Sequence, residues 1–138
     1  LANFEGETVL AGILVVDDNV ELRRGIGFMA RLGGHVVREA GTIAEAMDRF
    51  AESLQGGPRI DIVISDVDVP DGLGTELHDE LKPELGDRAF VLITGDLFEM
   101  HRQEYARLHG LPLYFKGTDR INLFLTSLRH NPIAALAS

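Results

Sequence analysis

Short apolar runs alternate with amphipathic segments along almost the whole chain, and this alternation limits the fold more than any other feature of the sequence. The apolar runs have the length and composition of buried strands: residues 13–16, 35–40, 60–65, 89–93 and 113–115. Each run is followed by a segment whose apolar residues recur at helical spacing. Strands that alternate with helices form parallel sheets with helices packed on their faces. The sequence therefore predicts a doubly wound α/β fold, (βα)5, with a five-stranded parallel sheet.

The helical segments also carry signals for their ends and buried faces. The second helix opens with Thr42-x-x-Glu45, which has the form of a capping box. The third helix should end near Pro83, because proline has no amide hydrogen to donate. The other helices are expected at about residues 20–32, 97–108 and 118–131. The buried face of the second helix is expected at Ile43, Met47, Phe50 and Leu54, and that of the third at Leu73, Leu77 and Leu81.

Length and composition describe one domain and exclude several classes of partner. The chain has 138 residues, 45% of them hydrophobic, and no internal linker or repeat. We expect the domain at residues 12–131, between a lead-in at 1–11 and a C-terminal tail at 132–138. A net charge of −9 argues against direct contact with nucleic acid, and no cationic amphipathic helix or lipidation motif suggests a membrane. The absence of cysteine excludes disulfides and is compatible with the cytoplasm, the location that we expect.

Polar residues stand directly after four of the apolar runs. Asp17 and Asp18 follow the first run, Asp66 the third, Thr94 the fourth and Lys116 the fifth. In an open parallel sheet, ligands bind in the crevice outside the carboxyl ends of the strands. The acids, the hydroxyl and the ammonium group therefore predict one shared site.

The acids of this site favour a divalent cation. Asp17, Asp18 and Asp66 repel one another, which raises the pKa of at least one of them unless a cation compensates the charge. Ligands that are all oxygen atoms favour Mg²⁺, or Mn²⁺, as the cation. The alternative is that these aspartates cap the helices that follow, as aspartate often does.

With a cation bound, Asp66 can act as a nucleophile toward a phosphoryl group and form an aspartyl phosphate. Such a transfer needs mainly alignment and neutralisation of charge. The Lys116 ammonium group and the Thr94 hydroxyl can each serve oxygens of the phosphoryl group. The alternatives are a β-branched strand residue at Thr94 and a solvated surface lysine at Lys116.

The motifs that carry these residues resemble the receiver domain of two-component response regulators. They are Val15-Val16-Asp17-Asp18-Asn19, Asp66-x-x-x-Pro70-x-x-x-Gly74, Thr94-Gly95 and Lys116. The resemblance runs from about Gly12 to His130. It implies the CheY-like, flavodoxin-like fold with strand order 2-1-3-4-5, and a signalling domain rather than an enzyme.

The resemblance also implies roles for the site residues. Asp66 would be the phosphoacceptor, charged by a phosphohistidine on a histidine kinase or a histidine phosphotransfer domain. Asp18 and Asp66 would bind Mg²⁺ directly with the backbone carbonyl of Asp68, and Asp17 would act through water. Thr94 would turn toward the phosphoryl group, and Lys116 would pair with it. The face of the fourth helix, fifth strand and fifth helix would carry the output, and it is also where we expect any homodimer. Because the chain begins with Leu rather than Met, we expect the receiver of a hybrid sensor kinase.

Some positions depart from the receiver pattern or modulate it. Gly117 stands where receivers usually have a proline in a cis peptide bond, and a cis bond without proline costs about 2.5–4 kcal/mol. Leu113 stands where receivers usually have the aromatic residue that couples to Thr94. Asp68 and Asp96 are expected to change the lifetime of the phosphorylated state, or else only to add negative charge at the mouth of the site.

Two other readings use the same residues. Asp66-Val67-Asp68-Val69 is similar to the nucleophile motif of haloacid-dehalogenase-type phosphatases. Those enzymes place their metal-binding acid pair after the lysine, whereas here the pair precedes the nucleophile. The third reading is a receiver-shaped binding module that no longer accepts a phosphoryl group. Gly117 and Leu113 favour it, and the complete set of acids, Thr94 and Lys116 argues against it.

Overall fold

A five-stranded parallel sheet forms the centre of the domain, in a computed structural model that describes residues 10–95, 100–116 and 123. Its strand order is β2-β1-β3-β6-β7, which is the predicted order 2-1-3-4-5 once the expected strands are counted along the chain. The strands are β1 (Gly12–Val16), β2 (Val36–Ala40), β3 (Ile62–Asp66), β6 (Ala89–Thr94) and β7 (Leu113–Phe115). The predicted fold class is confirmed, with strand ends shifted by one or two residues.

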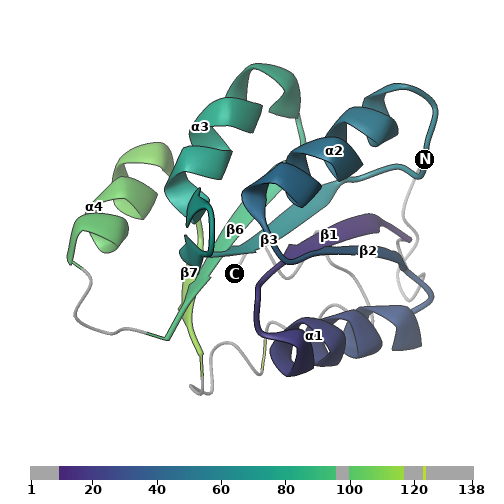
Figure 1. Cartoon of the computed structure of the whole chain (residues 1–138), viewed down its shortest axis with the longest axis horizontal. Coiled ribbons are helices and arrows are strands. Elements are labelled where there is room, and N and C mark those ends of the chain that lie inside the picture. The colour runs from purple at the N-terminus through teal and green to yellow at the C-terminus, as the bar shows by residue number, and fades with distance from the viewer. Residues whose placement is uncertain (1–9, 96–99, 117–122, 124–138) are drawn as a thin grey trace, which may run out of the picture.

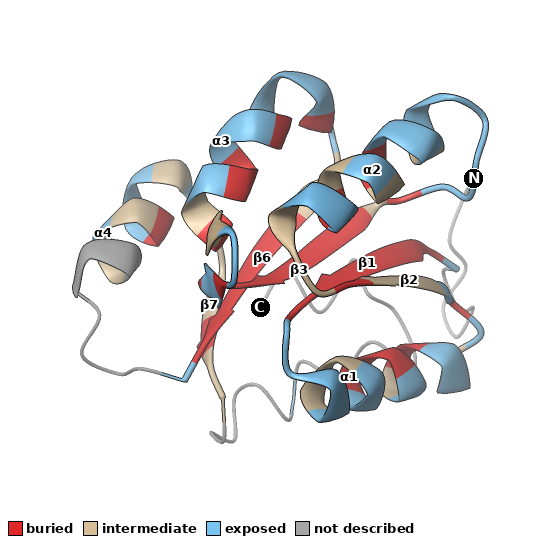
Figure 2. Ribbon diagram, in the orientation of Figure 1, coloured by how far each residue is buried: buried red, intermediate tan, exposed pale blue. Residues whose placement is uncertain are grey.

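Helices cover both faces of the sheet (Figure 1). They are α1 (Val20–Leu32), α2 (Ile43–Leu54), α3 (Gly74–Leu85) and α4 (Met100–His109). Alternate strand residues point to opposite faces, so the core has two parts. Leu14 and Leu92 pack with α2, α3 and α4 on one side, and Val15 and Ile93 pack with α1 on the other. The central strands are buried on both faces (Figure 2), and this explains why they read as continuous apolar runs.

The third helix does not end near Pro83 as predicted. It continues to Leu85, which is buried, and ends at Gly86, whose φ of +55° suits glycine. Pro83 lies on the exposed side, so the helix loses one hydrogen bond but keeps the burial of Leu81 and Leu85. The missing amide hydrogen alone predicts an earlier end, and the apolar packing of this last turn outweighs it.

Two residues of the predicted helix faces are also placed differently. Leu73 precedes α3 as its N-cap residue and belongs to the short strand β5. Leu54 is the last residue of α2 and is 42% exposed. The N-terminus of α2 agrees with the prediction more closely: the Thr42 hydroxyl accepts the amide hydrogen of Glu45 at 3.1 Å, while the Glu45 carboxylate accepts from Gly41 rather than from the Thr42 amide.

A small hairpin follows β3. Strands β4 (Asp68–Val69) and β5 (Gly72–Leu73) pair antiparallel around the Pro70-Asp71 turn. No strands were predicted here from the sequence.

Several predictions fall outside the described residues. They concern the first residues of the fourth helix at 97–99, the last helix apart from Leu123, the lead-in at 1–9 and the tail. In the part of the chain that the structure describes, no helix is both long and apolar enough to cross a membrane.

Candidate functional site

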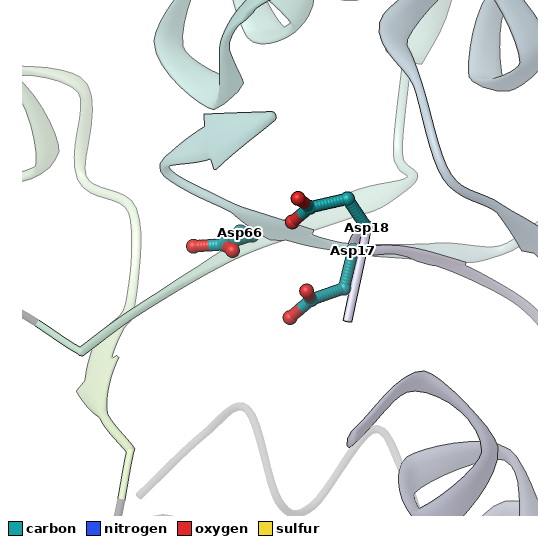
Figure 3. Close-up of side chains that lie close together, drawn as sticks. All are labelled: Asp17, Asp18 and Asp66. Carbon is teal, nitrogen blue, oxygen red and sulfur yellow. The ribbon is translucent and has the colours of Figure 1, made fainter. Parts of the chain in front are cut away.

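The predicted site residues meet at the carboxyl edge of the sheet. Asp17 and Asp18 follow β1, Asp66 ends β3, Thr94 ends β6, and Lys116 follows β7. Carboxylate oxygens of the three aspartates lie within 4.8 Å of one another. In Figure 3 the side chains of the acid pair after β1 reach toward Asp66 on the neighbouring strand.

Asp17 is the most buried member of the cluster, with an exposed fraction of 0%. Its Oδ1 atom accepts the amide hydrogen of Asn19 at 2.8 Å. Its Oδ2 atom lies 3.0 Å from the Lys116 Nζ atom but makes no hydrogen bond of good geometry with any described residue. Asp18 is exposed. One buried carboxylate oxygen is thus held only by the charge of Lys116.

Lys116 bridges the acids of the two strands. Its Nζ atom lies 3.1 Å from Asp66 Oδ2 and 3.0 Å from Asp17 Oδ2. Burial disfavours the charged ammonium form, but the close carboxylates of both aspartates outweigh it, and the pKa of Lys116 is raised. The backbone N–H of Lys116 also donates to the Thr94 carbonyl at 2.7 Å, which ties the end of β7 to the end of β6.

Asp66 has an environment that resists ionisation. Burial, and then the negative charge of Asp17, raise the pKa of Asp66. The Lys116 ammonium group and the Asp68 amide, 3.4 Å from Oδ1, act in the opposite direction without cancelling the rise. Removal of negative charge from this pocket would therefore favour the ionised, nucleophilic form of Asp66.

The donor set fits a hard divalent cation. Three carboxylates face one ammonium group, so the pocket carries excess negative charge, and the buried Oδ2 atom of Asp17 has only the ion pair with Lys116 among the described residues. The candidate ligands are oxygen atoms, which Mg²⁺ prefers. The geometry thus suits a cation held between Asp17, Asp18 and Asp66.

The predicted modulators are distributed unevenly around the site. Asp68 is exposed in β4 beside Asp66. Asp96 and Gly117 lie outside the described residues, and so does the peptide bond between Lys116 and Gly117. Leu113 packs with the core on the side of α2, α3 and α4. Tyr114 is buried on the opposite side, with α1. The aromatic residue next to Leu113 therefore does not replace the missing aromatic on that face.

Two residues that hold the site in place were not predicted from the sequence. The Arg23 guanidinium donates to the backbone carbonyl of Asp17 at 2.8 Å. The Asp71 carboxylate, at the tip of the hairpin, accepts the amides of Ile43 and Ala44 at 2.7 and 3.0 Å and so caps α2. A Pro-Asp-Gly turn is a signal for an aspartate that accepts backbone amides, although not for which amides.

A second polar cluster, also missed, joins α3 to α4. The Tyr105 hydroxyl donates to Asp79 at 2.7 Å, so the 2.8 Å contact with His78 Nδ1 is a donation from the imidazole to the tyrosine oxygen. The His109 ring stacks on Tyr105 with a centroid distance of 4.1 Å. Burial, and then the nearby His109, lower the pKa of His78. Tyr105 therefore faces α3, whereas Leu108 is 66% exposed on α4.

Comparison with known proteins identifies the family. The model of the response regulator receiver domain matches residues 13–124. The DNA-binding transcriptional activator DevR/DosR of Mycobacterium tuberculosis is 36% identical over 87 residues, which are 60% of this chain and 37% of that protein. The sensor kinase CckA of Brucella abortus is 32% identical over 108 residues, which are 76% of this chain and 11% of that protein.

A solved structure agrees with this fold. The crystal structure of a response regulator receiver domain protein from Clostridium thermocellum has a TM-score of 0.73 and 25% identity to this chain, and the match covers 92% of this chain and 94% of that one. This chain spans well under half the length of the two relatives named above, at 37% and 11%. The chain belongs to the response regulator receiver domain family of two-component systems.

Proposed function

We propose that this receiver domain accepts a phosphoryl group on Asp66 from a phosphohistidine of a histidine kinase or a histidine phosphotransfer domain. The observation that carries the proposal is the position of the Asp66 carboxylate, which lies between the Lys116 ammonium group and the acid pair Asp17 and Asp18. A bond forms between an Asp66 oxygen and phosphorus while the bond from phosphorus to the imidazole nitrogen of the donor breaks. The imidazole keeps the electron pair of that bond. The protein mainly aligns the groups and stabilises charge.

The acids would hold Mg²⁺, or Mn²⁺, during this transfer. Asp18, Asp66 and the backbone carbonyl of Asp68 are the proposed direct ligands, and Asp17 would act through water. When bound, the cation supplies positive charge for the phosphoryl oxygens and for the carboxylates. Asp17 already has a buried oxygen without a hydrogen bond from the described residues, which supports this assignment.

Lys116 and Thr94 are proposed to serve the phosphoryl group. Lys116 is held against both acids and has a raised pKa, so its ammonium group is charged at neutral pH and available to a phosphoryl oxygen on Asp66. Thr94 ends the neighbouring strand β6 and is joined to Lys116 through the backbone. Asp68 and Asp96 are proposed to modulate the lifetime of the phosphoryl group.

The proposed output is signalling rather than catalysis of an external reaction. A change at Thr94 and Lys116 would shift the population of conformations on the face that includes α4 and β7. The partner would be a histidine kinase or a histidine phosphotransfer domain in the cytoplasm, with this chain as the receiver of a hybrid kinase. A homodimer through the same face is a further part of the proposal, since Leu108 of α4 is exposed.

Intact mass after incubation with Mg²⁺ and acetyl phosphate tests the proposal. The wild-type protein should gain one phosphoryl group and Asp66→Asn none. Asp87→Asn is the matched control, because Asp87 is an exposed aspartate between α3 and β6, away from the site, and it should still gain the group. Turnover of phosphomonoesters would instead indicate a phosphatase. Absence of any mass gain with several phosphodonors would favour a binding module without phosphoacceptor activity.

A further inference from the structure

Arg23 connects helix α1 to the backbone of the acid pair. Its Nη1 atom donates to the Asp17 carbonyl at 2.8 Å, and its Nε atom donates to the Glu39 carboxylate of β2 at 3.0 Å. The Arg23 side chain is only 18% exposed. The guanidinium is planar and offers several donors in a fixed arrangement, so two bonds in different directions fix its position.

The carbonyl that Arg23 binds belongs to the peptide group between Asp17 and Asp18. The amide of Asp17 still pairs with β2, by donating to the Ala40 carbonyl at 3.0 Å, but Asp17 lies beyond the end of β1 at Val16. A backbone carbonyl that leaves a sheet needs a donor from elsewhere. Arg23 is that donor, and rotation of this peptide group would change the direction in which the Asp18 side chain leaves the backbone.

The surroundings of Arg23 keep it in this place. Glu39 is also bound by Arg31, whose Nη2 atom lies 3.3 Å from the other carboxylate oxygen. Gly41 leaves room on the side of the guanidinium, since a Cβ atom there would lie 3.2 Å from Arg23 Nη1. Arg31 has the same acidic partner and lies on the same helix, but its other hydrogen bond is to the Val37 carbonyl and not to Asp17.

We propose that Arg23 is a positioning residue for the cation site: by holding the Asp17–Asp18 peptide group, it sets the direction of the Asp18 carboxylate toward Asp66. This inference rests on the proposed cation site and adds a residue to it. Arg23 acts through Asp18 and does not itself contact the cation.

Calorimetric titration with Mg²⁺, in the absence of any phosphodonor, tests the inference. Arg23→Gln should raise the Kd for Mg²⁺ about tenfold, as loss of a group that orients metal ligands commonly does. Arg31→Gln removes a positive charge and a Glu39 contact from the same helix, and its Kd should stay within about twofold of the wild-type value. Equal Kd values for Arg23→Gln and wild type, or an equal weakening in both variants, would overturn the role of Arg23.

Two further measurements separate this inference from folding and from the proposed function. Urea unfolding without Mg²⁺ shows whether Arg23→Gln is folded. If it is not, Arg23→Lys replaces it, because lysine keeps the charge but cannot make both bonds in the same way. Arg23→Lys should then raise the Kd several-fold, and a wild-type Kd in this variant would overturn the inference. Failure of the wild-type protein to bind Mg²⁺ would instead overturn the cation site itself.

Discussion

Replacement of Lys116 by Met removes the charge that compensates the buried acids while keeping a side chain of similar length. In the wild-type protein the ammonium group lies 3.0 Å from Asp17 and 3.1 Å from Asp66, and Asp17 is fully buried. The Lys116→Met variant would remove this shared cationic partner from both carboxylates. We expect it to be less stable than the wild type without Mg²⁺, by an amount that depends on pH.

The size of this loss is limited by proton uptake. Loss of one partner of a buried ion pair typically costs about 3–5 kcal/mol, and Lys116 is 23% exposed, which places it at the lower end. Uptake of one proton by Asp66 restores the net charge that Lys116 provided. For a carboxyl group with an ordinary pKa of about 3.9, that proton costs about 4 kcal/mol at pH 7 and about 1.5 kcal/mol at pH 5. At pH 7 the proton costs more than the lost ion pair, so the expected loss of stability stays at about 3 kcal/mol. At pH 5 proton uptake costs less and limits the loss of stability to about 1.5 kcal/mol.

The direction of the pH dependence follows from the pKa of Asp66. Burial and Asp17 already raise this pKa in the folded protein, and loss of Lys116 raises it further. A carboxyl group whose folded pKa is raised contributes stability below its unfolded pKa of about 3.9, and that stability is lost as the pH rises through the folded pKa. The deficit of the variant must therefore grow between pH 5 and pH 7.

Urea unfolding at pH 5 and pH 7, with and without Mg²⁺, measures this effect. Mg²⁺ that binds only the folded protein stabilises it by about 2.7 kcal/mol at a concentration of 100 times the Kd. Because the variant lacks the competing ammonium group, Mg²⁺ should stabilise it more than the wild type. The difference in free energy of unfolding between the two proteins should therefore become smaller. Lys82→Met is the control, since Lys82 is exposed on α3 and is the other lysine of the chain. A deficit that is the same at both pH values and unaffected by Mg²⁺ would refute the role of Lys116.

Three smaller changes test other features, each by urea unfolding. Pro83→Ala should raise the free energy of unfolding by about 1–2 kcal/mol, because it restores a helix hydrogen bond inside α3; no gain would contradict this. Asp71→Asn should weaken the loss of stability below about pH 4, since the amides of α2 lower the pKa of Asp71 and its contribution disappears as the pH falls through the folded pKa. His78→Phe should reduce the loss of stability between pH 7 and pH 5. The folded pKa of His78 is lowered, so its contribution to stability is present above about pH 6.5 and is lost as the pH falls through the folded pKa. A pH profile of stability that does not change in the Asp71 or the His78 variant would exclude the contribution of that residue.

The strands could be predicted from the sequence because burial on both faces leaves a continuous apolar run. β1, β3 and β6 are buried along nearly their whole length. Helix ends are less predictable, because they depend on what the last turn packs against. At Pro83 the local signal to stop was outweighed by the burial of Leu85, which is a property of the assembled core.

The positions of the site residues were predictable for a related reason. A residue at the end of a parallel strand has its place fixed by that strand. Correct prediction of the strands was therefore enough to bring Asp17, Asp66 and Lys116 together. It was not enough to predict the residues that support the site. Asp71 caps a helix 28 residues earlier in the chain, and His78 contacts a tyrosine 27 residues later. Such pairs follow from the packing of hairpins and helices, which no local pattern encodes.

Leu113, which departs from the receiver pattern, shows how information from the sequence and from the structure combines. The sequence has a leucine where receivers usually carry an aromatic residue, and Tyr114 is the next residue. Successive residues of a strand point to opposite faces, and Tyr114 is buried beside α1 while Leu113 packs with the core under α4. The Tyr114 ring thus lies on the side of the sheet opposite to α4. The backbone connects the site to β7, because the Lys116 amide donates to the Thr94 carbonyl at 2.7 Å. This hydrogen bond therefore joins the end of β6 to Lys116, the residue that also holds Asp17 and Asp66.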